Sequence, residues 1–236
     1  MSRGVIATAV AGLTTSMRRS MTLAITIVLT CALPVVAQEA PVAEATEQPS
    51  VRIPDTLVST EGNVLGRGTS EWMVTVGPAW GVVIFHSAAG HRYAMETISW
   101  GHVLTDHHGS GAWRGNFEWA IETVPVYNQS RPTSTFGVGV SPMVWRWNFE
   151  PRGKLAPFGE LAGGALFTRD PVPARTTKAN FTAHAGAGLR IFIRPREALI
   201  LSYRFHHISN GNRVEPNPGV NAHVLQFGWT HVRPRR

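Results

Sequence analysis

Apolar and polar residues alternate with a period of two along much of the chain after residue 71. The alternation is clearest at 113–124, where Trp113, Phe117, Trp119 and Ile121 share one face and charged or amide side chains occupy the other. A period of two is typical of a β-strand whose two faces meet different surroundings, whereas an amphipathic helix repeats every 3.6 residues. The pattern therefore predicts eight strands and no helix, at 72–85, 92–104, 113–124, 135–149, 155–167, 180–193, 197–209 and 221–232.

The two faces of these predicted strands favour a membrane barrel over a soluble sandwich, which would also alternate. The apolar face is rich in Trp and Phe near strand ends, and the polar face carries charges of both signs, as a filled barrel interior requires. We therefore predict an all-β fold: an eight-stranded antiparallel transmembrane β-barrel of the outer-membrane type, at 71–236. The long polar connections 125–134, 169–179 and 210–220 are expected outside the cell, and the short turns 150–154 and 194–196 in the periplasm. A change of phase near Pro142 predicts a bulge or an edge irregularity.

Residues 1–37 are typical of a cleaved secretory signal peptide. A basic Arg18-Arg19 pair precedes an apolar run at 22–36, and small residues stand before Gln38. A transmembrane anchor is disfavoured because the run is short and no basic cluster follows it. Translation from Met1 and from Met17 both remain open. Residues 38–70 are expected to form a flexible lead-in, which is rich in Pro, Ala and Glu up to about residue 50.

Composition and charge narrow the class of protein. Only 16% of the residues are charged, while Gly (23) and Trp (8) are abundant, as in membrane barrels. Cleavage after Ala37 removes three arginines and no acid, so the net charge falls from +7 to +4. This modest excess suits a surface beside anionic lipopolysaccharide, and an exported chain without a basic stripe gives no reason to expect a nucleic-acid partner. The one cysteine, Cys31, lies in the signal, which excludes disulfides and thiolate chemistry in the mature chain.

The richest chemistry lies in the last predicted hairpin. His207 and Ser209 are two residues apart, so they project from the same face of a strand as Leu201, Tyr203 and Phe205. That phase predicts that the pair points toward lipid, where polar side chains are costly unless they have a function. A histidine base beside a serine nucleophile is suited to acyl transfer from an ester. The alternative is a polar belt at a strand end. On the next strand, Asn221 shares the outward face.

The hairpin also resembles a known family. His207-Ile208-Ser209-Asn210, followed by Pro216-Asn217 and Gly219, is similar to the active-site hairpin of the lipid A 3-O-deacylase (PagL-type) family. That resemblance implies an eight-stranded outer-membrane barrel with a Ser-His-Glu triad on its exterior. It implies Ser209 as nucleophile, His207 as base and Asn210, Gly211 and Asn217 as the oxyanion-hole region. The position of the triad Glu is occupied by Asn221, and Glu215 in the loop is an alternative acid.

Three functions follow as hypotheses. The first is an outer-membrane lipid A deacylase that hydrolyses an ester-linked acyl chain through Ser209 and His207. The second is a non-catalytic barrel that binds lipopolysaccharide or supports envelope integrity. The third, a calcium-dependent phospholipase that dimerises in the membrane, is disfavoured because no carboxylate cluster predicts a calcium site. The expected partners are the membrane and lipid A or lipopolysaccharide of the outer leaflet, and homo-oligomerisation is left open.

Other polar residues are assigned structural roles. His206, Glu118, Glu122 and Glu160 are predicted to lie in the barrel interior, and the tryptophans to form a girdle at the membrane interface. The His107-His108 pair has no obvious third ligand and is predicted to be a solvated turn. We expect neither a metal nor a cofactor.

Overall fold

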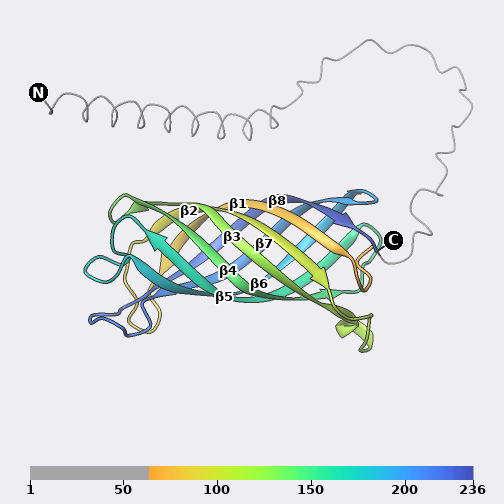
Figure 1. Ribbon diagram of the computed structural model, residues 1–236, viewed down its shortest axis with the longest axis horizontal. Helices are drawn as coiled ribbons and strands as arrows, with labels where there is room; N and C mark the ends of the chain where they lie inside the picture. The colour runs from red at the N-terminus through yellow and green to blue at the C-terminus, as the bar shows by residue number, and fades with distance from the viewer. Residues whose placement is uncertain (1–63, 236) are drawn as a thin grey trace, which may run out of the picture. The chain divides into compact units, whose positions relative to one another are not determined.

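The computed structural model describes residues 64–235, so the predicted signal peptide (1–37), its two alternative starts and most of the predicted lead-in (38–70) lie outside the described residues. Eight strands form one closed antiparallel barrel, in which each strand pairs with its neighbours along the chain and β1 closes against β8 (Figure 1). The predicted eight-stranded barrel is thus confirmed. The elements are β1 (Ser70–Val82), β2 (Arg92–Val103), the 3-10 turn η2 (Gly111–Trp113), β3 (Gly115–Arg131), β4 (Thr135–Phe149), β5 (Leu155–Thr168), β6 (Ala179–Arg194), β7 (Glu197–Ser209) and β8 (Val220–Arg233).

The barrel has two distinct rims. The loop rim carries the connections 83–91, 132–134, 169–178 and 210–219, which gather at the left of Figure 1. The terminal rim carries the start of β1, the end of β8 and the connections 104–114, 150–154 and 195–196. Among residues 64–235, no helix is long and apolar enough to cross a membrane.

The strands are strongly tilted against the barrel axis. We start at Ser209 on β7 and step from each residue to its partner on the next strand, once around the barrel. This path returns to β7 at Leu199, which is ten residues from Ser209. Such a shift in register is the geometric consequence of closing a sheet of tilted strands. On the outer wall, a path perpendicular to the strands from β7 through β6 and β5 to β4 therefore descends from the loop rim toward the terminal rim.

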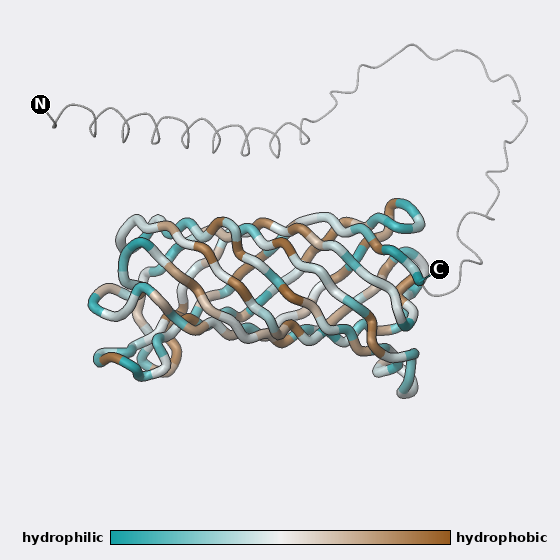
Figure 2. Tube along the Cα trace, in the orientation of Figure 1, coloured by the Kyte–Doolittle hydropathy of each residue, from teal (hydrophilic) through white to brown (hydrophobic). Residues whose placement is uncertain are grey.

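Hydrophobic and hydrophilic positions alternate along the strands (Figure 2), and the side chains sort accordingly. Outward positions are mostly exposed Trp, Phe, Leu, Ile, Val and Ala, while inward positions are buried and largely polar. His206 is one of these interior residues, and its Nδ1 lies 2.7 Å from the Tyr93 hydroxyl. A polar interior inside an apolar outer wall is the arrangement that a membrane barrel needs, and the reverse of a soluble β-sandwich.

Buried ion pairs fill the middle of the barrel. Arg190 donates from Nε and Nη2 to both carboxylate oxygens of Glu71, at 2.7 and 2.5 Å. Bidentate contacts of this kind satisfy several donors at once, so a buried charge is not left without a partner. The predicted interior roles of Glu118, Glu122 and Glu160 are confirmed by further pairs. These include Arg204 with Glu122 (2.7 and 2.8 Å) and Glu160 (2.6 Å), and Arg146 with Glu118 (2.9 Å) and Glu160 (3.0 Å).

The largest departure from the predicted boundaries is at β3, while β1 ends at Val82 and not at the predicted residue 85. We expected a strand at 113–124 followed by a long loop at 125–134, but β3 begins at Gly115 and continues to Arg131, so the connection is only 132–134. Pro125 does not end the strand because the register with β4 shifts between Val124 and Tyr127, and a bulge tolerates a residue without an N–H. The bulge predicted near Pro142 is confirmed by a register shift between Val140 and Met143.

The tryptophans are distributed unevenly between the two rims. Six lie on strands near the terminal rim, with Trp72 paired to Trp100 and Trp119 paired to Trp145, and Trp113 lies in the adjoining turn. Trp80, the eighth, lies near the loop rim. The predicted girdle is therefore present at one end of the barrel and nearly absent from the other.

Candidate active site

The end of β7 brings His207 and Ser209 to the outer wall at the loop rim. Their partners on β6 are Ala183 and Phe181, both exposed, and the residues between and before them, Ile208 and His206, point inward. The predicted phase of this strand is thus the one observed. Among the residues that the structure describes, Ser209 Oγ makes no hydrogen bond, which leaves it available to a ligand. Catalytic hydrogen bonds often shorten only when substrate is bound.

Asn221 orients the imidazole of His207. The two residues are direct partners across β7 and β8, and Asn221 Oδ1 lies 2.7 Å from His207 Nδ1. Asn221 Nδ2 donates to the backbone carbonyl of Ile84 at 2.9 Å, so the amide oxygen is the atom left to face the imidazole. An oxygen at this position accepts the Nδ1 hydrogen and leaves the lone pair of Nε2 free, which is the tautomer that a general base requires.

The connection 83–91 holds Asn221 and Gly219 in place beside His207. Sequence reasoning did not predict this support. Besides Ile84, Ala88 of the same connection donates its N–H to the carbonyl of Gly219 at 2.9 Å. Gly219 has a positive φ of 65°, and a Cβ there would lie 3.0 Å from His207 Cε1. A glycine is therefore needed both for the backbone conformation and for the space beside the imidazole. No motif in the sequence links residues 84–88 to the site, since the link is made by backbone groups.

The predicted oxyanion residues lie together in the 210–219 loop but differ in their availability. Asn210 is fully buried; its backbone N–H donates to Asn217 Oδ1 at 3.1 Å and its Nδ2 to the carbonyl of Val214. Asn210 is thus engaged in holding the loop. Asn217 Nδ2 donates to Asn212 at 2.7 Å and has a second hydrogen, and Gly211 is exposed at the turn beside Ser209. Asn217 and the Gly211 backbone therefore each have a donor that no hydrogen bond within residues 64–235 uses.

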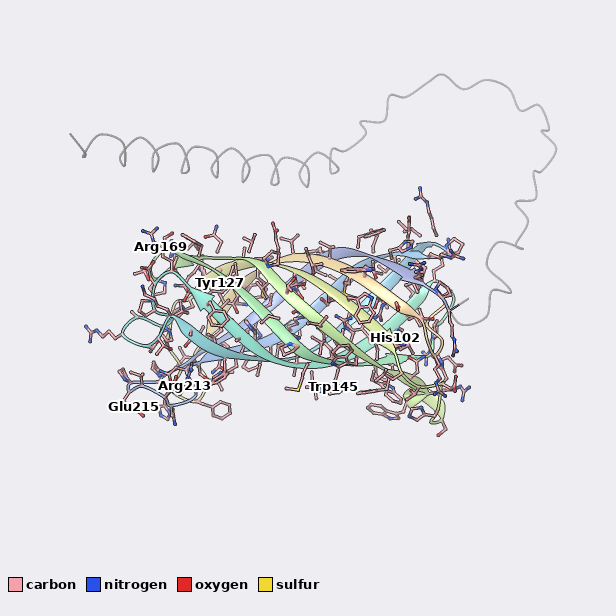
Figure 3. All side chains as sticks on the ribbon, viewed as in Figure 1. His102, Tyr127, Trp145, Arg169, Arg213 and Glu215 are labelled. Atoms are coloured by element: carbon pink, nitrogen blue, oxygen red, sulfur yellow. The ribbon has the colours of Figure 1, made fainter. Side chains whose placement is uncertain are left out.

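Glu215, the alternative acid, is exposed and lies at the far end of this loop (Figure 3). Within residues 64–235 it forms no ion pair and no hydrogen bond with His207.

Arg213 holds the loop against β6. It donates to the carbonyls of Asn210 and Ala179 at 2.9 and 2.8 Å, and its guanidinium stacks 4.7 Å from the ring centre of Phe181.

The predicted turn at His107-His108 lies at the opposite rim from His207. Asn116 Nδ2 lies 3.2 Å from His107 Nδ1, and burial lowers the pKa of His107. His108 packs edge-on against Trp147 but stays exposed, as predicted for a solvated turn, whereas His107 is half-buried. Within residues 64–235 no group of three His, Cys, Asp or Glu side chains is placed to hold a metal ion.

An open apolar groove begins beside His207. It has a volume of ≈ 410 Å³ and crosses β7, β6, β5 and β4 on the outer wall. Its floor consists of two small residues, Ala183 and Gly163. They lie side by side in one row with His207, since Ala183 is the strand partner of both. Larger side chains, Trp145, Leu161 and Phe205, border it. Because of the strand tilt, the groove descends from the candidate site into the region that faces the hydrocarbon.

A family model described as lipid A 3-O-deacylase (PagL) matches residues 85–230, which is more than half of the chain and contains His207, Ser209 and Asn221. The chain belongs to the lipid A 3-O-deacylase (PagL) family. It is therefore an outer-membrane β-barrel of a deacylase family. In such barrels the longer loops face the outside of the cell, so we expect the loop rim on that side.

Solved structures with a similar barrel include the outer membrane enzyme PagL, with 14% identity, 67% of this chain and 97% of that chain covered and a TM-score of 0.47. Others are the N-terminal β-barrel domain of OprF from Pseudomonas aeruginosa (13% identity, 71% and 99% covered, TM-score 0.43) and OprG from the same organism (7%, 73% and 100%, 0.41). No curated protein matches the chain significantly.

Proposed function

We propose that this member of the lipid A 3-O-deacylase family hydrolyses an ester-linked acyl chain of lipid A at its outer wall, with Ser209 as nucleophile and His207 as general base. The observation that carries the proposal is the outward-facing Ser209, His207 and Asn221 group at the loop rim, with the 2.7 Å contact between His207 and Asn221. Lipid A occupies the outer leaflet, so its ester bonds would meet this wall without leaving the membrane.

In the proposed reaction, Ser209 Oγ attacks the ester carbonyl carbon while its proton passes to His207 Nε2. The negative oxygen of the tetrahedral intermediate is stabilised by the Gly211 N–H and the free N–H of Asn217. When the carbon–oxygen bond to the sugar breaks, His207 returns the proton to the leaving alcohol. Water, deprotonated by His207, then attacks the acyl-serine. The bond between the acyl carbon and Ser209 Oγ breaks, His207 returns the proton to Oγ, and the fatty acid leaves.

Asn221 would complete the catalytic group in place of an acid. Its carbonyl fixes the imidazole tautomer, but it lacks the full charge that would stabilise imidazolium in the transition state. We expect Asn221→Ala to lower the deacylation rate by at least about tenfold and Asn221→Glu to raise it by about tenfold, because the second variant supplies the missing charge.

The measurement is the initial rate of fatty-acid release from lipid A in one detergent, with Glu215→Gln as the matched control. Glu215 is exposed and makes no contact with His207, so its variant should keep the wild-type rate. Equal rates for wild type and both Asn221 variants would remove Asn221 from the mechanism, and a damaged Glu215→Gln would assign the acid role to Glu215.

The apolar groove would hold the acyl chain that is cleaved. It leaves His207, crosses three strand spacings of about 4.8 Å each and descends toward the membrane core, so it offers about 14 Å of apolar surface. We expect Ala183→Leu, which would fill the groove next to His207, to lower kcat/KM for long-chain esters about tenfold more than for short-chain esters. Ala187→Leu is the matched control, since Ala187 is also exposed on β6 but does not line the groove. Equal losses on long and short chains would place the acyl chain elsewhere.

The test of the proposed function is mass spectrometry of lipid A after incubation with the refolded barrel. Wild type should remove one ester-linked acyl chain from lipid A and leave diacyl phospholipid in the same micelles unchanged. Unchanged lipid A would favour the non-catalytic barrel, and cleavage of the phospholipid alone would indicate a phospholipase.

A further inference from the structure

At the terminal rim, the outer wall of β8, β1 and β2 carries a row of polar side chains. Arg233 pairs with Ser70 across β8 and β1, and Ser70 pairs with His102 across β1 and β2. All three occupy outward positions, so the Cβ atoms of direct partners lie about 5 Å apart in one row. His102 (Figure 3) is held in the row by a 3.1 Å contact between its Nδ1 and Ser70 Oγ. This polar surface lies at the opposite end of the barrel from the candidate active site.

A second row, one step deeper along the strands, is aromatic. Trp72 of β1 pairs with Trp100 of β2 on one side and with His231 of β8 on the other. Successive outward rows are two residues apart, or about 6.6 Å along the strand. Trp100 stacks on His102 with ring centres 6.2 Å apart, so the two rows are in contact. Indole rings gather where the hydrocarbon meets the headgroups, and the polar row therefore lies at the depth of lipid phosphates.

Positive charge at this end of β8 has no counterion. Among residues 64–235, Arg233 forms no ion pair, and neither does Arg196, whose carbonyl accepts the N–H of the residue before Arg233 at 2.8 Å. The neighbouring carboxylate of Glu197 does not compensate for them, because it pairs with Arg194 at 2.8 Å. Two exposed guanidinium groups therefore lie beside the polar row, which favours an anionic ligand.

The resulting surface, which we call the terminal-rim patch, consists of Ser70, Trp72, Trp100, His102, Arg196 and Arg233. We propose that it binds an anionic phospholipid, with the headgroup phosphate on the polar row and the acyl chains along the aromatic row. Guanidinium groups pair with phosphate oxygens through two parallel hydrogen bonds, and indole N–H groups find polar partners at the membrane interface. A charged row at the rim and an aromatic row one step deeper match a ligand with one anionic end and hydrocarbon beyond it.

The patch is separate from the wall that we propose to bind lipid A. We expect the loop rim outside the cell, so the terminal rim meets the inner leaflet, where the surrounding lipids are phospholipids. The inference therefore does not rest on the proposed function, and its test measures binding and not hydrolysis.

The experiment measures dissociation constants for phosphatidylglycerol and for diacylglycerol with the same acyl chains, by native mass spectrometry of the refolded barrel in detergent. Wild type should bind phosphatidylglycerol at least about tenfold more tightly, because each of two cations beside an anionic lipid strengthens binding about fivefold. Arg196→Gln/Arg233→Gln should lose most of this preference and bind diacylglycerol as wild type does. The matched control is Arg169→Gln/Arg175→Gln, which removes from the loop rim two exposed cations that form no ion pair within residues 64–235. It should bind both lipids as wild type does.

Two further measurements separate the two rows. Trp72→Ala should weaken the binding of both lipids by the same factor, because the indole would contact the acyl chains that the two lipids share. Soluble glycerol phosphate in excess should not displace phosphatidylglycerol, because it has no chains to lie along the aromatic row.

An unchanged preference in Arg196→Gln/Arg233→Gln would overturn the proposal. An equal loss in Arg169→Gln/Arg175→Gln would also overturn it, because any exposed cation would then serve. Displacement of the lipid by glycerol phosphate would show a site for a free phosphate and would reject the phospholipid as its occupant. Heat-modified migration on gels identifies folded barrels before each measurement, and both double variants should fold because the residues they replace are exposed.

Discussion

Ser209→Ala and His207→Ala are each expected to lower the rate of lipid A deacylation by at least about 10³-fold while the barrel stays folded. The loss should be this large because the two side chains act on the same proton, so neither works without the other. For the same reason the double variant should be little slower than either single variant. Both side chains point away from the packed interior, so heat-modified migration on gels and the β-type circular dichroism spectrum should not change.

Initial rates with purified, refolded variants are the measurement, and Thr123→Val is the control. Thr123 is an exposed hydroxyl residue on the outer wall of β3, and its Oγ1 donates only to a backbone carbonyl. Its variant should keep the wild-type rate. If Ser209→Ala retains most of the activity, then Ser209 has been wrongly assigned as the nucleophile, even if lipid A is still the substrate.

Arg146→Met is expected to destabilise the barrel by about 3–5 kcal/mol, the usual cost of removing one partner from a buried ion pair. Arg146 is fully buried, and its guanidinium donates to Glu118, Glu160 and Ser99. Without it, two carboxylates of the barrel interior lose a positive neighbour in a region that water does not reach. The change should appear as a lower urea midpoint for unfolding from lipid vesicles, followed by tryptophan fluorescence.

The matched control is Arg114→Met at the terminal rim. Arg114 forms a single ion pair with Glu150 in which both side chains are about half exposed, so its loss should cost about 0–1 kcal/mol. If Arg146→Met and Arg114→Met unfold at the same urea concentration as wild type, the interior ion pairs do not stabilise the barrel.

Much of the fold was predictable because alternate residues of each strand face lipid and the polar barrel interior. The sequence therefore alternates between apolar and polar residues with a period of two. The phase of β7, read from Leu201, Tyr203 and Phe205, was sufficient to place His207 and Ser209 on the outer wall. The same rule placed Glu118 and Glu122 inside, where they pair with arginines. The extent of β3 was not predictable in this way, because Pro125 reads as the end of a strand unless the bulge within β3 is known.

The candidate site was only partly accessible to sequence reasoning. Strand periodicity alone places His207, Ser209 and Asn221 on the outward face. The role of Asn221 beside His207 was implied only by the family resemblance. The support from Ile84 and Ala88 could not be predicted, since it runs through backbone groups of a loop more than 120 residues earlier in the chain. The 2.6 Å contact between the Tyr203 hydroxyl and His223 Nδ1 depends on the register of β7 against β8, which alternation does not determine.

The central claim, that Ser209 is an activated nucleophile on the lipid-facing wall, is tested most directly by covalent labelling. A fluorophosphonate with a long alkyl chain reacts with serines that a neighbouring base activates, and peptide mapping by mass spectrometry locates the adduct. We expect one label per barrel, on Ser209, formed with wild type and lost in His207→Ala. A wild-type barrel that deacylates lipid A while Ser209 remains unlabelled, or a label that forms equally in His207→Ala, would contradict the account.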